Sequence, residues 1–265
     1  MKGIVLAGGT ATRLFPLTAT TSKQLLPVYD RQMIFYPLNT LIKGGIRDIL
    51  VIVSPEHSGQ FLNLLGSIFK DKGINVYFEV QNVPRGLADA FILGESFIGD
   101  DNVTMILGDN IFEHDFSEDI NSFRSGGKIF AKKVEDWQRF GIVKFDENGK
   151  ALEIVEKPKE WISDYAIPGI YIYDNRVVGF AKEVAPSERS EIEITSLHNR
   201  YLESGELEVG VCEGAWLDAG TFDTLLEAGR IVREKGISEN FHPLINESIE
   251  EFNEKLKAMA KKRLA

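Results

Sequence analysis

The chain has 265 residues, of which 43% are hydrophobic, enough for one large α/β domain with a substantial core and unlike a disordered or low-complexity protein. Its 40 acidic residues outnumber its 30 lysines and arginines, and the formal net charge of -10 gives no general attraction to nucleic acid or to an anionic membrane. Any anionic ligand must therefore be held by a local group of cations.

The cysteine content and the N-terminus bear on the compartment. Cys212 is the only cysteine, so no internal disulfide and no multi-cysteine zinc site can form. The first apolar run is too short for a secretory signal, and no stretch approaches the roughly 20 apolar residues of a membrane span. We therefore expect a cytoplasmic protein that binds neither a membrane nor nucleic acid.

A glycine-rich loop follows the first apolar run. Gly8 and Gly9 stand where a buried strand would emerge into a tight turn. Glycine lets the backbone approach a ligand and lets successive N–H groups converge on phosphate oxygens, and Arg13 and Lys23 add positive charge. Two glycines after a strand most often form only a turn, but with both cations the segment predicts a cradle for a triphosphate.

Strand-like runs alternate with helical patterns in the first part of the chain. One helical segment places Phe61, Leu64, Leu65 and Ile68 at i, i+3, i+4 and i+7, which gives it a single apolar face. This alternation predicts an α/β fold with a Rossmann-like, predominantly parallel mixed sheet flanked by helices. The predicted strands of this part are Ile4–Ala7, Ile49–Val53, Val76–Val80 and Val103–Leu107.

The pattern changes after Asp109, where strands predominate and predict a smaller β-rich subregion that extends the sheet. A last helix, from about Asn246 to Leu264, has acidic residues early and basic residues late, an order that complements the helix dipole. No repeat or low-complexity linker divides the chain. The additional strands are predicted at Lys128–Val134, Ile142–Phe145 and Ile170–Tyr173, and the apolar stripe of the last helix at Ile249, Phe252, Leu256 and Met259.

Two aspartates and one glutamate–lysine pair are candidates for chemistry. Asp109 directly follows an apolar strand, at the edge where open α/β sheets bind ligands. Asp218 precedes Gly220-Thr221, which resembles a helix start. Alone, these residues would be a turn former and a cap, but together near a phosphate loop they would hold Mg²⁺. Glu156 can accept hydrogen bonds from sugar hydroxyls, while Lys157 can neutralise a sugar phosphate.

Several segments occur in the order seen in a known enzyme family. The first resembles the signature of sugar-1-phosphate nucleotidylyltransferases, and the whole set resembles the glucose-1-phosphate thymidylyltransferases among them. The resemblance extends from Lys2 to about Gly229. The segments are LAGGTATRL, SKQLLPVYD, LGDNIF, FGIVKFD, EKP, DYAIPGIYIYD and WLDAGT.

The resemblance implies a role for each matching residue. Gln24 and Gln81 would read the base, since an amide offers both a donor and an acceptor, and Gly86 would allow close backbone approach beside it. The implied catalytic residues are Arg13, Lys23 and Lys157. The implied nucleotide-binding residues are Gly8, Gly9, Thr12, Arg13, Lys23, Gln24, Gln81, Gly86 and Asp109. The implied sugar-phosphate-binding residues are Asn110, Gly141, Glu156, Lys157, Ile167 and Arg189, and the implied metal ligands are Asp109 and Asp218.

The activity that the resemblance implies is Mg²⁺-dependent transfer of a thymidylyl group from dTTP to glucose 1-phosphate, which gives dTDP-glucose and pyrophosphate. The expected partners are therefore glucose 1-phosphate and dTTP, with UTP as a second candidate nucleotide. Because members of the family are commonly oligomeric, the resemblance also implies a homo-oligomer. One domain would span residues 1–240, with about 1–110 binding the nucleotide and about 111–240 the sugar phosphate. Residues 241–265 would form a C-terminal helical extension.

Four positions depart from the family pattern. Ala11 replaces the third glycine of the signature, and its methyl group restricts a backbone with φ above zero. Pro168 stands where the family has threonine, and Ser196 where many members have aspartate. Phe140 lacks the hydroxyl of the usual tyrosine. The resemblance therefore defines the reaction type better than the sugar preference.

Other classes of function lack their motifs. A dinucleotide-dependent oxidoreductase needs G-x-G-x-x-G, a P-loop kinase G-x-x-x-x-G-K-[ST] and a hydrolase G-x-S-x-G, and none occurs in the sequence. Three alternatives stay open. They are a uridylyltransferase, a nucleotidylyltransferase for a different sugar 1-phosphate, and a non-catalytic sugar-nucleotide sensor.

Overall fold

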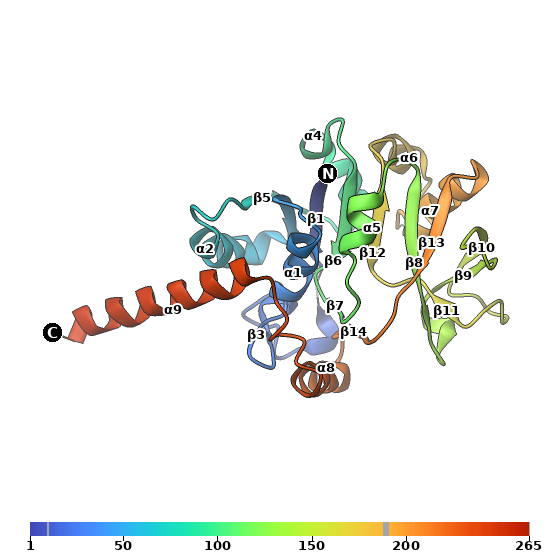
Figure 1. Ribbon diagram of the computed structural model, residues 1–265. Coiled ribbons are helices and arrows are strands. Elements are labelled where there is room, and N and C mark those ends of the chain that lie inside the picture. Colours follow the sequence, from blue (N-terminus) through green and yellow to red (C-terminus); the bar gives the residue numbers. More distant parts are fainter. Residues whose placement is uncertain (10, 188–190, 265) are drawn as a thin grey trace.

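The computed structural model describes residues 1–9, 11–187 and 191–264 of the chain (Figure 1). Its centre is a sheet in which ten strands are described, and the half formed by the first part of the chain is parallel. Each strand predicted there is present, and three begin one or two residues earlier than predicted. In their order across the sheet they are β5 (Asn75–Val80), β4 (Asp48–Val53), β1 (Lys2–Ala7) and β6 (Val103–Leu107).

The second half of the sheet is mostly antiparallel and forms the β-rich side of the molecule. The strand β12 (Ile170–Tyr173) of this half runs antiparallel to β6, so the sheet continues without a break between the two halves. A tight turn joins β9 and β10, because the N–H of Gly149 donates to the carbonyl of Asp146 at 3.0 Å. The strands are β8 (Gly127–Lys133), β9 (Gly141–Phe145), β10 (Ala151–Glu156), β11 (Tyr165–Ala166), β12 (Ile170–Tyr173) and β13 (Leu207–Val211).

Helices cover both faces of the sheet, because alternate residues of a buried strand point to opposite sides. In β1, Val5 and Ala7 belong to one core cluster and Ile4 and Leu6 to the other. The helices on the first face are α1 (Phe35–Lys43), α2 (Ser58–Ile68), α5 (Ser117–Ser122), α8 (Phe222–Glu234) and the start of α9 (Pro243–Leu264). Those on the second face are α3 (Asp89–Leu93), α4 (Glu95–Ile98), α6 (Val177–Glu183) and α7 (Ile194–Glu203).

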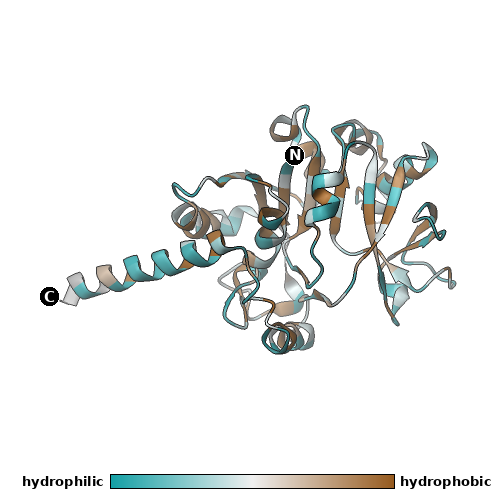
Figure 2. Cartoon of the chain, in the orientation of Figure 1, coloured by the Kyte–Doolittle hydropathy of each residue, from teal (hydrophilic) through white to brown (hydrophobic). Residues whose placement is uncertain are grey.

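The predicted C-terminal helix is present as α9, which extends away from the body of the molecule (Figure 1). The predicted apolar stripe divides in two. Ile249 and Phe252 pack against the core, whereas Leu256 and Met259 are 47% and 56% exposed. Figure 2 shows hydrophobic residues along the central strands and a largely hydrophilic outer part of α9. Within the described residues, no helix has the length and apolar character needed to span a membrane.

Short elements at the carboxyl edge of the parallel strands position the residues of the site. The strands β7 (Asn110–Phe112) and β14 (Trp216–Asp218) pair in antiparallel fashion, which places Asp218 opposite Asn110. Segments about 100 residues apart in sequence thereby meet. The remaining short elements are β2 (Pro27–Val28), β3 (Arg31–Gln32) and the 3-10 helices η1 (Thr12–Leu14), η2 (Lys23–Leu25), η3 (Pro55–His57) and η4 (Trp137–Arg139).

Candidate active site

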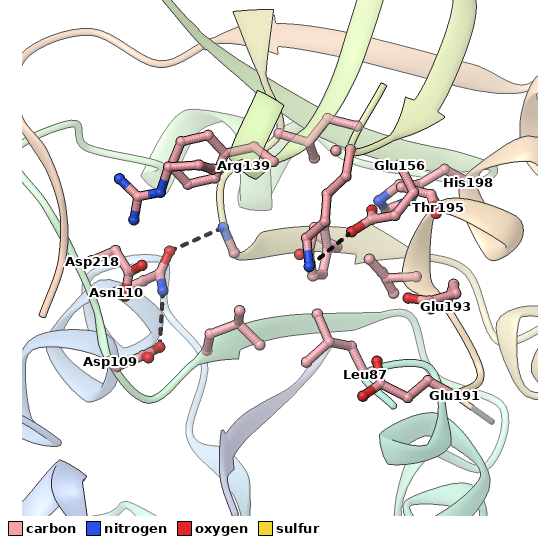
Figure 3. Close-up of a pocket in the computed structure, with 18 of the residues that line it drawn as sticks. Leu87, Asp109, Asn110, Arg139, Glu156, Glu191, Glu193, Thr195, His198 and Asp218 are labelled. Carbon is pink, nitrogen blue, oxygen red and sulfur yellow. Dashed lines mark hydrogen bonds and ion pairs between the residues drawn. The ribbon is translucent and has the colours of Figure 1, made fainter. Parts of the chain in front are cut away.

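A cleft of about 260 Å³ lies where the parallel half of the sheet meets the β-rich side. Figure 3 shows the two aspartates at one side of the cleft and Glu156 with His198 at the other. The cleft brings together many of the residues that the sequence predicts, although they come from distant segments. Those that line it are Arg13, Asp109, Asn110, Gly141, Glu156, Lys157, Ile167 and Asp218.

The two aspartates act on each other electrostatically. Burial and the negative charge of Asp109 raise the pKa of Asp218, and Lys23, Arg13 and Arg139 oppose this rise only in part. Burial would also raise the pKa of Asp109, but the charge and hydrogen bond of Lys23 outweigh it and lower that pKa. A pair of partly buried carboxylates with opposite pKa shifts is an arrangement that a divalent cation would stabilise.

Asp109 is held from two sides. The ammonium group of Lys23, from η2, forms an ion pair with its Oδ2 atom. The side-chain amide of Asn110 donates to Oδ1 at 3.0 Å. Asn110 is itself fixed, because its amide oxygen accepts hydrogen bonds from Trp216 Nε1 at 2.7 Å and from the backbone N–H of Gly169 at 3.1 Å. The carboxylate therefore has a defined orientation before any ligand arrives.

Two described residues of the predicted phosphate loop have positive φ. Gly9 has φ of 105° and Ala11 has φ of 46°, so the departure from glycine falls on a position that glycine favours. Arg13 follows in η1 and is exposed, and its guanidinium reaches the start of α8. A Cβ atom on Gly220 would lie 3.0 Å from both Arg13 Nη2 and Asp218 Oδ1. Gly220 therefore leaves the space beside these two charged groups free of a side chain.

The predicted base-reading residues lie near the same sheet edge but do not line the cleft. Gln24 and Gln81 are both buried, and their amides have protein partners. Gln24 accepts a hydrogen bond from Ser22 Oγ at 2.5 Å, and Gln81 donates to Asp89 at 2.9 Å. Gly8, Gly9, Thr12, Lys23 and Gly86 also lie outside the lining of the cleft. The assigned nucleotide contacts of these residues remain predictions.

The other side of the cleft carries the predicted sugar-phosphate residues. Lys157 Nζ lies 4.0 Å from Glu156 Oε1, and Lys157 has φ of 44°, a conformation rarely adopted by residues other than glycine. Gly141 leaves room for its neighbours, since a Cβ there would lie 2.9 Å from Thr195 Cγ2 and 3.1 Å from Glu156 Oε2. Arg189, the remaining residue predicted for this group, lies outside the described residues.

Sequence reasoning missed several residues of the cleft. Arg139, from η4, brings a cation to the side of Asp218, and it pairs with Asp136 at 2.5 Å. Trp216 stands in a matched segment, and its hydrogen bond to Asn110 was not foreseen. Leu107, Phe140, Gly169 and Tyr171 also stand in matched segments, but no role was assigned to them. The other side chains belong to loops and to α7, where no local motif marks them. The residues that were missed are Leu87, Leu107, Arg139, Phe140, Gly169, Tyr171, Glu191, Glu193, Ile194, Thr195, His198 and Trp216.

The arrangement defines a class of enzyme. A parallel α/β sheet carries at its carboxyl edge a left-handed glycine loop, flanking cations and two converging carboxylates, and this set suits transfer of a phosphoryl-type group between anionic partners. The chain belongs to the nucleotidyl transferase family, whose model matches residues 2–235. It is therefore a nucleotidyltransferase enzyme.

Two similar proteins are consistent with this membership. A protein of Neisseria meningitidis named glucose-1-phosphate thymidylyltransferase is 50% identical over 248 residues, which cover 91% of this chain and 86% of that protein. A Mycolicibacterium smegmatis protein of the same name is 50% identical over 88% of this chain and 82% of its own length.

Two solved structures share the fold. A Bacillus anthracis protein in complex with a sucrose superimposes with a TM-score of 0.84 at 41% identity and covers 93% of this chain and 99% of that chain. UDP-glucose pyrophosphorylase complexed with UDP-glucose has a TM-score of 0.76 at 21% identity over 88% of this chain and 98% of its own. The second likeness concerns the fold alone.

Proposed function

We propose that this enzyme transfers a thymidylyl group from dTTP to glucose 1-phosphate and releases pyrophosphate. The observation that carries the proposal is one cleft with the paired carboxylates at one side and Glu156 at the other. Arg13 lies near Asp218, and Lys157 lies 4.0 Å from Glu156. Two anionic substrates can thus enter one cleft in an acidic protein. The names of the relatives from N. meningitidis and M. smegmatis support the choice of substrates.

The reaction requires positioning more than proton transfer. A phosphate oxygen of the sugar 1-phosphate attacks the α-phosphorus of dTTP, and the bond from that phosphorus to the bridging oxygen breaks as pyrophosphate leaves with the electron pair. The attacking phosphate is already ionised near neutral pH, so no general base is needed. Lys157 would hold the sugar phosphate, while Arg13 and Lys23 would neutralise the triphosphate and the developing charge on pyrophosphate.

The donor set fits Mg²⁺. Asp109 and Asp218 offer only hard carboxylate oxygens, and among the described residues no third histidine, cysteine or acid joins them in a metal-binding group. Mg²⁺ commonly takes one or two carboxylates and completes its shell with substrate phosphates and water. When bound, the ion would neutralise charge on the phosphates, and Asn110 would keep Asp109 oriented toward it.

The test is pyrophosphate release with Mg²⁺ and glucose 1-phosphate, comparing dTTP, UTP, dCTP and dATP. Thymine differs from uracil by one methyl group, which contributes about 1–3 kcal/mol of discrimination, so slower but measurable use of UTP is expected. UTP used better than dTTP would favour a uridylyltransferase. No release with any pair of nucleotide and sugar 1-phosphate would exclude the proposed reaction.

The cofactor is tested separately from the substrates. Asp218→Asn should lower kcat/KM at least 100-fold and raise the Mg²⁺ concentration needed for half-maximal rate. Asp223→Asn, in the first turn of the adjacent helix α8, is the matched control and should keep normal activity.

The homo-oligomer implied by the family remains a prediction, and light scattering of the purified chain would check it.

A further inference from the structure

His198 has one ring nitrogen without a partner. The side chain lies on α7 and is fully buried, and its Nδ1 atom is 2.5 Å from the hydroxyl oxygen of Tyr173. Among the described residues, Nε2 is the only buried side-chain nitrogen or oxygen that lacks a hydrogen bond. Leaving a buried polar group unpaired costs free energy, so this atom calls for an explanation.

The hydrogen bond to Tyr173 determines which kind of partner is missing. If Tyr173 donates to Nδ1, the ring carries its proton on Nε2 and a single donor is left unpaired. If Nδ1 donates instead, the Tyr173 hydroxyl proton and the Nε2 lone pair are both unpaired. The first arrangement leaves fewer buried groups unsatisfied. Burial also lowers the pKa of His198 to about 3, so the ring is neutral and Nε2–H is a donor.

His198 is part of the wall of the cleft, although its Nε2 atom is shielded from solvent. Tyr173, the partner of Nδ1, does not line the cleft, so a ligand that pairs with this ring would have to reach Nε2 from the cleft side. Thr195, one turn earlier on the same face of α7, also lines the cleft, and the ring of Tyr171 packs 5.1 Å from the His198 ring between centroids. Figure 3 places His198 beside Thr195 and Glu156, across the cleft from Asp109.

The surroundings of Nε2–H favour a neutral hydroxyl as its partner. Three carboxylates, those of Glu156, Glu191 and Glu193, line this side of the cleft together with one cation, Lys157, which is already assigned to the sugar phosphate. Beside the neutral histidine, the carboxylates would oppose a second anionic group. A sugar hydroxyl can accept from Nε2–H and donate to an acidic or carbonyl oxygen at the same time. A phosphate would have to approach the carboxylates without a positive charge on the histidine.

We propose that His198 Nε2–H donates a hydrogen bond to one hydroxyl of the hexose ring of the sugar 1-phosphate and thereby selects for sugars that carry it. The proposal rests on the proposed function and adds a residue that determines sugar specificity. It predicts that one ring position, and not the others, is read by His198. A buried water bound to Nε2 in place of the sugar is the competing explanation.

A cycle of variants and substrate analogues tests this contact. The variants are His198→Gln, which keeps an amide donor, and His198→Met, which has a similar length but no donor. Each is compared with the wild type by kcat/KM for glucose 1-phosphate and for its 2-, 3-, 4- and 6-deoxy analogues. Thermal unfolding checks that both variants fold, and His198→Phe replaces His198→Met if the latter does not.

The expected result is a specific non-additivity. For one particular deoxy analogue, kcat/KM relative to glucose 1-phosphate should fall about tenfold more in the wild type and in His198→Gln than in His198→Met. For every other analogue, kcat/KM should fall by the same factor in all three enzymes. Equal ratios for every analogue would overturn the proposal and point to a buried water or a purely structural histidine. If the wild type is inactive with glucose 1-phosphate and with every other sugar 1-phosphate, the proposed function is contradicted, and this proposal with it.

Discussion

Lys23 and Asp109 form an ion pair across 86 positions of sequence, joining the loop that follows β1 to the end of β6. The Lys23 side chain is 12% exposed and that of Asp109 is 17% exposed, so the pair is largely shielded from solvent. The lysine thus neutralises a carboxylate that otherwise faces Asp218. Binding of a triphosphate with its metal would let Lys23 exchange the carboxylate for a phosphate.

Replacing Lys23 with methionine should lower kcat/KM by about 100-fold or more, because the variant lacks the ammonium group that would stabilise the negative charge developing on the phosphates. The variant should also be less stable by about 1–3 kcal/mol, since Asp109 keeps its burial without a counter-charge. Steady-state kinetics and urea unfolding measure the two effects. Lys72→Met, which breaks an ion pair with the exposed Glu251, is the control and should leave kcat unchanged. Normal kinetics in Lys23→Met would contradict its assigned role.

Gly220→Ala should reduce kcat/KM about tenfold without a large loss of stability. The new Cβ would lie 3.0 Å from Arg13 Nη2 and from Asp218 Oδ1, so one of the two charged groups must move. Gly179→Ala in α6 is a matched control, since its Cβ would meet nothing within 4 Å and alanine favours a helix by about 0.5–1 kcal/mol. Equal activities of the two variants would show that the close approach at Gly220 is irrelevant to turnover.

Arg139→Leu should lower kcat/KM by about three- to tenfold, with the larger effect at low ionic strength. Arg139 lines the cleft, its guanidinium lies 5.3 Å from the Phe140 ring centroid, and its charge acts on Asp218. Because the side chain is half exposed, salt should screen its attraction for anionic substrates. The measurement is kcat/KM against salt concentration, with Arg124→Leu, at an exposed position outside the lining of the cleft, as the control. A salt dependence identical to that of the wild type would contradict the prediction.

The sequence predicted most of the fold because its signals are local. In the run Val103–Leu107, successive residues point to opposite faces of the sheet, and nearly all of them are buried. The structure has this strand with the predicted bounds. Thr221 likewise caps α8 through a reciprocal pair with Thr224, as the helix start in the sequence indicated. Only half of the predicted stripe on α9 is covered, because periodicity shows that a helix has an apolar face but not where its partner ends.

The site was less accessible to local patterns. Asp109 and Asp218 look like a turn former and a cap until β7 and β14 pair and bring them together, so family resemblance had to supply what spacing could not. His198 lies in a helical stretch and would be interpreted as an ordinary core residue. Its position in the cleft follows from the packing of α7 against β10 and β8, which depends on contacts between segments far apart in the sequence.

Ala11→Gly should stabilise the protein by about 0.5–1 kcal/mol. The native φ of 46° costs alanine about 1–2 kcal/mol relative to a right-handed conformation, and glycine avoids this cost while losing somewhat more entropy on folding. Urea unfolding at pH 7 measures the difference. Ala7→Gly in β1 is the control and should destabilise, because that residue is buried in a strand. A destabilised Ala11→Gly would show that the loop backbone is not strained.

Asp174 gives the fold a specific dependence on pH. Its carboxylate is 6% exposed and accepts hydrogen bonds from the backbone N–H of Gly126 at 2.8 Å, from Arg176 Nη2 at 2.7 Å and from the Tyr201 hydroxyl at 3.0 Å. Burial alone would raise the pKa of Asp174, but these partners outweigh it and hold the pKa below the usual value of an aspartate. The carboxylate therefore binds a proton less readily in the folded state than in the unfolded state.

Asp174→Asn should lower the free energy of unfolding at pH 7 by about 3 kcal/mol, because the charged acceptor of Arg176 is lost. A depressed folded-state pKa contributes stability that is fully present above the ordinary pKa of an aspartate and is lost as the pH falls from there through the lower pKa of the folded state. The variant lacks this contribution, so its deficit relative to the wild type should shrink as pH falls below 3.8. Urea unfolding between pH 2.5 and pH 7 measures the deficit, with Glu147→Gln, at an exposed position, as the control. A deficit that stays constant over this range would contradict the assigned pKa shift.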